Sequence, residues 1–216
     1  MIGLIVARKG SKGFPGKNRK LVPIMLDEVE KSELDPLWIS TDDDELKDEV
    51  RGRRVKVHDR PDNLATDTTS VRDVVLEFAL TQKIHRSEYI YVLYPTYPQR
   101  RSSFINRAIF LAEQAPGHFV SILGFKKPKT HPYLCYEVTK TGKTLKLIGH
   151  QLYRRQDYPE CVEICHAVCI VKVSELHRVD HQMWSPYTHP FFIHDNDLID
   201  IDTPEDWEEY LDAKRG

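Results

Sequence analysis

The sequence of 216 residues lacks long apolar runs, has few cysteines and carries little net charge. No apolar stretch approaches the roughly 20 residues that span a bilayer, so we expect no membrane association. Four cysteines are too few for a disulfide framework, and no secretory leader precedes the first apolar run, so we expect a cytoplasmic protein. A formal net charge of −2 argues against a broadly basic surface, so we expect no nucleic-acid partner.

Several common catalytic and cofactor motifs are also absent. The glycines at positions 10, 13 and 16 fit neither the dinucleotide fingerprint G-x-G-x-x-G nor the P-loop, which would have serine or threonine in place of Asn18. Neither H-E-x-x-H nor G-x-S-x-G occurs. The segment CVEICHAVC (161–169) alternates like a strand, which would set cysteines four residues apart roughly 13 Å from each other. One zinc ion binds its ligands at about 2.3 Å, so this segment is not a zinc site.

Short apolar segments alternate with helical patterns along the first half of the chain. Runs typical of buried strands occur at 2–7, 37–40, 55–58, 89–94 and 119–124. Between several of them, apolar residues recur at i, i+3 and i+4, as expected of amphipathic helices. This alternation predicts an α/β fold with a doubly wound, mostly parallel sheet.

The pattern changes after about residue 125. Two alternating runs flank a Lys-Thr-Gly-Lys turn in the segment 133–148, which predicts a small β-hairpin that acts as a lid or as a dimer-contact lobe. A strand at 162–173 follows, and the last residues predict a strand running into a helix. We therefore expect a single domain over 1–216, with a lobe inserted at about 126–160.

The loop after the first apolar run, ARKGSKGFPGKN (7–18), combines three glycines with four cations. In parallel sheets, ligands bind where strands end and the following loops begin. Glycines let backbone N–H groups approach phosphates closely, while lysine and arginine neutralise their charge. The loop therefore predicts a polyanion site, and the alternative interpretation is a solvated surface turn.

Two aspartates alternate with isoleucines in LIDIDTPEDW (198–207) near the end of the chain. On a strand, Asp200 and Asp202 would face the same side, roughly 6.5–7 Å apart. Two such carboxylates suit Mg²⁺, which takes oxygen ligands together with substrate phosphates. The alternative is that one or both aspartates only cap the helix that TPED (203–206) begins.

Two further segments have a structural and a functional interpretation. In STDDDEL (40–46), Ser40 or Thr41 is expected to cap a helix whose first turn is acidic. RRQDYP (154–159) follows the expected hairpin, and arginine suits a carboxylate that it can bind through two hydrogen bonds. A solvated charged turn is the alternative for this segment.

Taken together, these motifs resemble the CMP-sugar synthetases, the acylneuraminate cytidylyltransferases, whose first loop reads close to A-R-x-G-S-K-G-x-P-x-K-N. Other landmarks follow in the order of that family: ISTDDDEL (39–46), RPDNLATDTTSVRDVV (60–75), YPTYPQR (94–100), HPY (131–133), RRQDYPE (154–160) and DIDTPEDW (200–207). The resemblance implies a Rossmann-like nucleotidyltransferase that transfers CMP from CTP to the hydroxyl of an acidic sugar of the nonulosonic or sialic type. It also implies Mg²⁺, release of pyrophosphate and a homodimer.

The resemblance assigns expected roles to individual residues. The nucleotide is expected to contact Ala7, Arg8, Gly10, Ser11, Lys12, Lys17, Asn18 and Arg60. The residues expected to act in catalysis are Lys12, Lys17, Arg8 and Asp202. The acidic sugar is expected to contact Tyr94, Thr96, Arg100, Arg155, Gln156 and His166. The metal is expected to bind Asp200 and Asp202.

The chain departs from the family pattern mainly on the acceptor side. Tyr94 and Tyr97 stand where glutamine and serine are usual, and Cys165 and His166 stand where asparagine and glycine are usual. The segments 19–39 and 51–55 are shorter than in the family. Two other acceptors are therefore alternatives to a sialic-type acid: a deoxy-octulosonate and a phosphonate. A further alternative is that the protein is a degenerate homologue that binds nucleotide without turnover.

Overall fold

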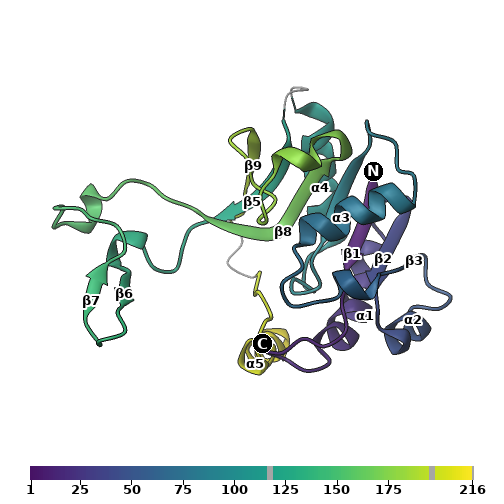
Figure 1. Ribbon diagram of the computed structural model, residues 1–216, viewed down its shortest axis with the longest axis horizontal. Helices are drawn as coiled ribbons and strands as arrows, with labels where there is room; N and C mark the ends of the chain where they lie inside the picture. The colour runs from purple at the N-terminus through teal and green to yellow at the C-terminus, as the bar shows by residue number, and fades with distance from the viewer. Residues whose placement is uncertain (116–118, 195–197, 216) are drawn as a thin grey trace.

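The computed structural model describes residues 1–115, 119–194 and 198–215. Seven strands form one sheet in the order β3-β2-β1-β4-β8-β5-β9 (Figure 1). Their bounds are β1 Ile2–Val6, β2 Leu37–Thr41, β3 Lys56–Asp59, β4 Tyr89–Leu93, β5 Ser121–Lys126, β8 Glu163–Lys172 and β9 Thr188–Phe192. Neighbouring strands run parallel except beside β8, which is antiparallel to both β4 and β5. The predicted mostly parallel sheet is confirmed.

Helices pack on both faces of the sheet, as a doubly wound fold requires. Their bounds are α1 Lys17–Val29, α2 Asp44–Glu49, α3 Val71–Thr81, α4 Ser102–Gln114 and α5 Pro204–Arg215. Four 3₁₀ helices lie between the larger elements: η1 Asp62–Leu64, η2 Pro132–Leu134, η3 Arg155–Asp157 and η4 Val173–Arg178. In the part of the chain that the structure describes, no helix is both long and apolar enough to cross a membrane.

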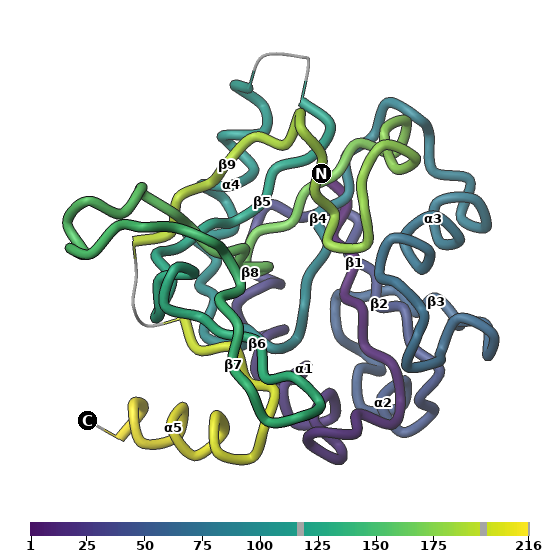
Figure 2. Tube along the Cα trace, turned by 60° about the vertical axis from the view of Figure 1, so that its left-hand side comes forward, coloured from purple at the N-terminus to yellow at the C-terminus, as the bar shows by residue number. Residues whose placement is uncertain are grey.

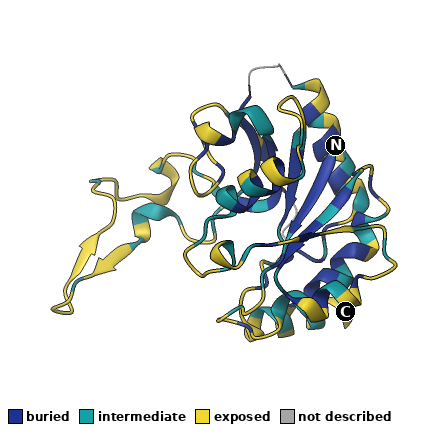
Figure 3. Cartoon of the chain, turned by 45° about the vertical axis from the view of Figure 1, so that its right-hand side comes forward, coloured by how far each residue is buried: buried dark blue, intermediate teal, exposed yellow. Residues whose placement is uncertain are grey.

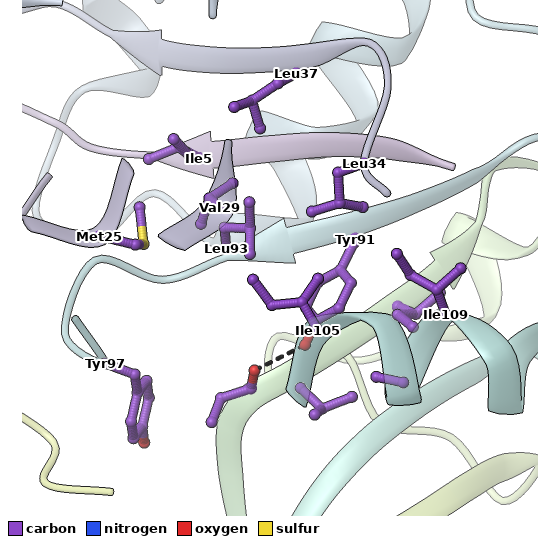
Figure 4. Close-up of a cluster of buried hydrophobic side chains, with 14 of the residues drawn as sticks. Ile5, Met25, Val29, Leu34, Leu37, Tyr91, Leu93, Tyr97, Ile105 and Ile109 are labelled. Carbon is purple, nitrogen blue, oxygen red and sulfur yellow. Dashed lines mark hydrogen bonds between the residues drawn. The ribbon is translucent and has the colours of Figure 1, made fainter. Parts of the chain in front are cut away.

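Alternate side chains of each strand point to opposite faces of the sheet, which divides the core into two main clusters. On one face, α1 and α4 pack against Ile5, Tyr91 and Leu93 of the central strands (Figure 4). The Tyr91 hydroxyl donates to the Ala167 carbonyl at 3.0 Å, so its polar atom is satisfied inside the core. On the other face, α3 and η4 pack against the intervening strand residues. Figure 3 shows the strands buried between these layers.

Residues 127–162 leave the sheet after β5, return in β8 and form an arm that projects from the rest of the protein (Figures 1 and 3). The predicted hairpin is present in this arm, with β6 (Tyr136–Val138) antiparallel to β7 (Thr144–Lys146). Both strands are exposed along their whole length. The arm extends away from the sheet (Figure 1), and its role as a lid or as a dimer-contact lobe stays a prediction.

The last segment differs from the predicted strand-to-helix unit. Residues 198–203 form no strand, and a backbone hydrogen bond from Ile201 to the Thr96 carbonyl (2.9 Å) ties them to the loop after β4. A strand needs a ladder with an extended neighbour, and the chain after β4 turns instead of continuing straight. Ile201 is buried against Phe14 and Tyr210, so α5 lies beside the first loop and α1 (Figures 1 and 2).

Candidate active site

Two adjoining cavities lie at the carboxyl ends of β1 and β4, the edge at which parallel sheets bind ligands. The first, the loop cavity, has a volume of about 260 Å³ and is lined by the loop after β1 and by residues between η1 and α3. The second, the aspartate cavity, has a volume of about 450 Å³ and is lined by the loop after β4, by His166 of β8, and by Asp200 and Asp202. The cavities share a wall formed by Thr69, Val71, Tyr94, Thr96 and Asp202.

Glycine and asparagine set the path of the first loop. Gly10 and Gly16 have φ angles of 76° and 71°, a left-handed conformation that only glycine adopts without a Cβ clash. Asn18 donates to the Arg8 carbonyl at 2.8 Å and so joins the two ends of the loop. The first turn of α1, which starts at Lys17, contains no acidic residue. The positive end of this helix therefore adds to the field beside the loop cavity.

Three cations of the loop pair with carboxylates from distant parts of the chain. Arg8 Nη2 lies 2.5 Å from Asp67 Oδ1, and Lys12 binds the other oxygen of the same carboxylate. The Lys17 ammonium lies 2.6 Å from Asp202 Oδ1. Hydrogen bonds from Lys12 and from Arg8 hold the pKa of Asp67 below its usual value. Both carboxylates are partly exposed, so an incoming polyanion can replace them at these cations.

The two aspartates face the aspartate cavity but are held differently. Asp200 Oδ2 accepts a hydrogen bond from the Tyr97 hydroxyl at 2.7 Å, whereas Asp202 pairs with Lys17. Neither caps α5, because Thr203 Oγ1 accepts from Asp206 N–H (3.2 Å) and Asp206 accepts from Thr203 N–H (2.8 Å). This reciprocal cap leaves both aspartates for the cavity and removes the capping interpretation.

The donor chemistry of this pair fits Mg²⁺. Each aspartate uses one oxygen in its side-chain bond and keeps a second carboxylate oxygen, and both residues line the aspartate cavity. Among the described residues, no group of three or more acidic, histidine or cysteine side chains could enclose an ion by itself. Mg²⁺ is commonly bound by one or two carboxylates together with water and substrate phosphates, which is what this geometry allows.

Arg60 lines the loop cavity from a buried position after β3. Its Nε donates to the Ser40 hydroxyl at 3.2 Å, and its Nη2 donates to the Ser40 carbonyl at 2.9 Å. Burial lowers the pKa of Arg60 to about 10, so the side chain stays charged at neutral pH. Ser40 was expected as a candidate helix cap, but it lies in β2 and α2 starts only at Asp44, so that prediction is wrong.

Aromatic side chains form the inner wall of the aspartate cavity. The rings of Tyr94 and His166 lie 4.7 Å apart, centre to centre, and both line this cavity with Thr96. His166 Nε2 lies 3.1 Å from the Gln182 carbonyl, and burial lowers the pKa of the imidazole. His166 is therefore neutral at pH 7 and presents an uncharged ring to the cavity.

Arg100 does not reach this site, although the sequence predicted contact with a sugar. Its side chain is fully buried, and the guanidinium donates to the Ala167 carbonyl at 2.8 Å and to the Tyr94 carbonyl at 2.7 Å. Both bonds bring the end of β4 and the middle of β8 together behind the cavity wall. The prediction of direct contact is wrong, because these backbone acceptors hold the charged end in the core.

The other predicted residues divide into those at the cavities and those elsewhere. Arg8, Ser11, Lys17 and Asn18 line the loop cavity, whereas Gly10 and Lys12 do not, and Lys12 pairs with Asp67 beside Arg8. Ala7 is buried in the core beneath the loop. Arg155 and Gln156 form part of η3 on the arm and are exposed there, so the same chain does not bring them to its own cavities.

Several cavity residues were not predicted from the sequence. Thr66 and Thr69 come from the polar run ATDTTS (65–70), whose density of hydroxyl groups is the signal that could have identified them. His181 and Gln182 also line the aspartate cavity. They follow η4 in a loop with no recognisable motif, so the sequence contained no signal for them.

Known proteins resemble this chain both in sequence and in fold. A family model described as cytidylyltransferase matches residues 2–124, which include β1 to β4 and the residues that line the loop cavity, except Asp202. N-acylneuraminate cytidylyltransferase of Streptococcus agalactiae serotype V is 24% identical over 222 residues, covering 95% of this chain and 51% of that protein. The chain thus spans about half the length of the first curated relatives that it matches. CMP-N,N'-diacetyllegionaminic acid synthase of Legionella pneumophila is 24% identical over 221 residues, covering 96% of this chain and 93% of that protein.

Solved structures share the fold at lower sequence identity. CMP:2-keto-3-deoxy-manno-octonic acid synthetase, in complex with CTP, superimposes with a TM-score of 0.70 at 15% identity, covering 100% of this chain and 99% of that one. 4-diphosphocytidyl-2C-methyl-D-erythritol synthase of Anaerococcus prevotii gives a TM-score of 0.66 at 15% identity, covering 100% and 96%. The cytidylyltransferase family model matches more than half of this chain. The chain therefore belongs to the cytidylyltransferase family, a family of nucleotidyltransferases.

Proposed function

We propose that this protein transfers CMP from CTP to the hydroxyl group of an acidic sugar of the nonulosonic type and releases pyrophosphate. One observation carries the proposal: Arg8 and Lys17 of the first loop, together with Arg60, line a basic cavity that adjoins a second cavity lined by Asp200 and Asp202. A triphosphate fits the basic loop cavity, and an acceptor fits the larger aspartate cavity beside it. The names of the sialic and legionaminic acid relatives support this acceptor class.

In the proposed reaction, the acceptor hydroxyl attacks the α-phosphorus of CTP and the bond to the β-phosphate oxygen breaks. Arg8, Lys12 and Lys17 neutralise charge that moves toward the leaving pyrophosphate. The shared wall of the two cavities sets the hydroxyl beside the phosphate, which is an orientation effect. The chemistry requires no covalent intermediate with the protein, in agreement with buried Cys165 and Cys169.

Asp200 and Asp202 are the residues that would hold Mg²⁺. Bound there, the ion would neutralise charge on the nucleotide phosphates. Tyr97 keeps Asp200 turned toward the cavity through its 2.7 Å hydrogen bond. When a triphosphate occupies the loop cavity, Lys17 exchanges its bond to Asp202 for one to phosphate, and Asp202 becomes a ligand with two available oxygens.

We further propose that the arm joins two copies of this chain. Apolar side chains are exposed along it: Tyr136, Val138, Leu145, Leu147, Ile148, Leu152 and Tyr153. So many exposed apolar groups on one projecting segment are typical of an interface. η3 lies on this arm and away from the cavities of its own chain. In a dimer joined by the arm, Arg155 and Gln156 would contact the aspartate cavity of the second copy.

Breaking this apolar surface is expected to produce monomers. Val138→Asp combined with Leu147→Asp would place two carboxylates in the contact, which desolvation strongly disfavours. Light scattering after gel filtration is expected to give twice the chain mass of 25.2 kDa for the wild type and the single mass for the variant. Lys143→Glu, in the exposed hairpin turn, is the matched control and should stay dimeric. A monomeric wild type would rule out the homodimer.

The activity itself is tested by following pyrophosphate release. The protein with Mg²⁺ is incubated with CTP, UTP, ATP or GTP, and with sialic-type acids, deoxy-octulosonate or phosphonates. We expect release only with CTP and fastest with a nonulosonic acid. Release with another acceptor would reassign the sugar, tight CTP binding without turnover would indicate a degenerate homologue, and preference for another nucleotide would contradict the proposal.

A further inference from the structure

A row of four polar side chains, three of them buried (Ser40, His58 and Arg60), runs from Glu77 of α3 across the sheet edge to the loop cavity. His58 Nε2 lies 3.1 Å from Glu77 Oε2, and His58 Nδ1 lies 3.1 Å from the Ser40 hydroxyl oxygen. Arg60 completes the row, with Nε 3.2 Å from the same hydroxyl oxygen. Ser40 and His58 are register partners on β2 and β3, so the sheet itself holds them side by side. Both are buried, which keeps water away from these bonds.

The proton positions along this row follow from the chemistry of each group. The Arg60 Nε–H can only donate, so the Ser40 oxygen accepts it and the Ser40 hydroxyl hydrogen is free to bond His58 Nδ1. His58 Nδ1 is then an acceptor, and the ring hydrogen lies on Nε2, which is 3.4 Å from Thr81 Oγ1 and 3.1 Å from Glu77 Oε2. Burial lowers the pKa of His58; the Glu77 charge opposes this shift and the Arg60 charge adds to it. The neutral, Nε2-protonated ring is thus the form that satisfies the bonds joining Arg60, Ser40 and His58 Nδ1.

Arg60 differs from the loop cations in the groups that bind its side chain. Arg8, Lys12 and Lys17 are each paired with a carboxylate, whereas within the described residues Arg60 forms no ion pair and is bound through neutral oxygens of Ser40. A buried guanidinium bound this way keeps its net charge for a ligand. Its direction then depends on the Ser40 hydroxyl, because that oxygen fixes the Nε side of the planar group.

We propose that His58 is a positioning residue for the nucleotide: it orients the Ser40 hydroxyl, which in turn holds the Arg60 guanidinium toward the loop cavity. The inference rests on the proposed function, in which Arg60 binds CTP. Without a ring nitrogen at the Nδ1 position, the Ser40 hydroxyl loses its acceptor and turns toward another one. The oxygen lone pair then leaves Arg60 Nε, and the guanidinium samples other directions.

His58→Phe and His58→Asn separate positioning from packing. Phenylalanine keeps an aromatic ring against Phe78, whose ring centre lies 5.3 Å from that of His58, but removes both nitrogens. Asparagine loses the ring but retains a polar atom near the Nδ1 position. A purely structural role predicts that His58→Phe is the milder change, whereas positioning of Arg60 predicts that His58→Asn is.

The readout is the NMR signal of the Arg60 Nε–H group, assigned by its loss in Arg60→Lys, together with CTP affinity by calorimetry. In His58→Phe we expect faster hydrogen exchange at Arg60 Nε and a Kd for CTP about tenfold higher, the effect of losing one hydrogen bond to a charged group. His58→Asn should retain most of both properties. Ser40→Ala, a smaller change in the same row, should reproduce the His58→Phe result if the latter folds poorly.

Thr81→Val is the matched control, because Thr81 Oγ1 contacts the far side of the same imidazole at 3.4 Å without touching Ser40. It should leave both the Arg60 signal and the CTP affinity unchanged. An unchanged Arg60 signal in both His58→Phe and Ser40→Ala would overturn the positioning role while leaving the proposed function intact. If the wild type does not bind CTP, the proposed function fails, and the Arg60 signal alone decides the inference.

Discussion

The Asp202→Asn variant is expected to release pyrophosphate roughly a thousandfold more slowly than the wild type, a loss typical of removing one charge-stabilising group from an active site. Asparagine keeps the shape of the side chain but removes its negative charge. That charge is the part needed to hold a divalent cation beside the phosphates and to bind Lys17, which lies 2.6 Å away. Rates are measured by coupled detection of pyrophosphate at saturating CTP.

CTP binding without metal should separate this loss from a general failure of the site. Because Asp202 faces the loop cavity, its neutralisation removes a repulsive charge, so the Kd for CTP is expected to stay the same or to fall. Asp212→Asn, at an exposed position on α5 whose partner is Arg215, is the control and should keep full activity. If Asp202→Asn retains more than about a tenth of the wild-type rate, Asp202 has no part in the chemistry.

Arg100→Ala is expected to lower the free energy of unfolding by about 3 to 5 kcal/mol. The substitution removes one donor to the Tyr94 carbonyl and one of the two donors to the Ala167 carbonyl, and it leaves a cavity where a fully buried side chain had been. Urea denaturation followed by tryptophan fluorescence measures the change. The same experiment tests the corrected role of Arg100, since a surface arginine that binds sugar would cost little stability.

Arg101→Ala provides the comparison within the same loop. Arg101 is adjacent in sequence but exposed, so its removal should change the unfolding free energy by less than about 0.5 kcal/mol. A similar small value for Arg100→Ala would contradict the buried role. A large loss of stability in Arg100→Ala is also expected to reduce activity, because the bonded carbonyl of Tyr94 belongs to the wall shared by the two cavities.

The sheet and the first loop were predictable from sequence because both depend on local patterns. Continuous apolar runs identified six strands of the described sheet but missed β9, and glycines at positions 10 and 16 marked turns that the structure shows with positive φ. Lys17 and Asp202 were also predicted from motifs, and the fold brings the two side chains together at the loop cavity. The acceptor wall also contains Tyr94 and His166, which were identified only as departures from a family pattern.

What the sequence did not predict depends on long-range packing. The family resemblance assigned Arg100 to the sugar, and only the fold reveals that its guanidinium has backbone acceptors within reach in the core. Ser40 reads as a helix cap because STDD is typical of one, yet β2 extends to Thr41 and buries it. Asp200 and Asp202 were assigned to a strand from their alternation, although no extended neighbour was present to form a ladder.

The bond between Lys17 and Asp202 joins positions 185 residues apart, and the buried contact of Phe14 with Ile201 and Tyr210 repeats this link. On the ribosome, the first loop is therefore made well before the carboxylate and the apolar side chains that complete it. At ordinary rates of translation, this interval amounts to roughly 10 to 40 s. A chain stalled or cleaved before Asp200 carries the basic loop without Ile201, Tyr210 and the carboxylate of Asp202.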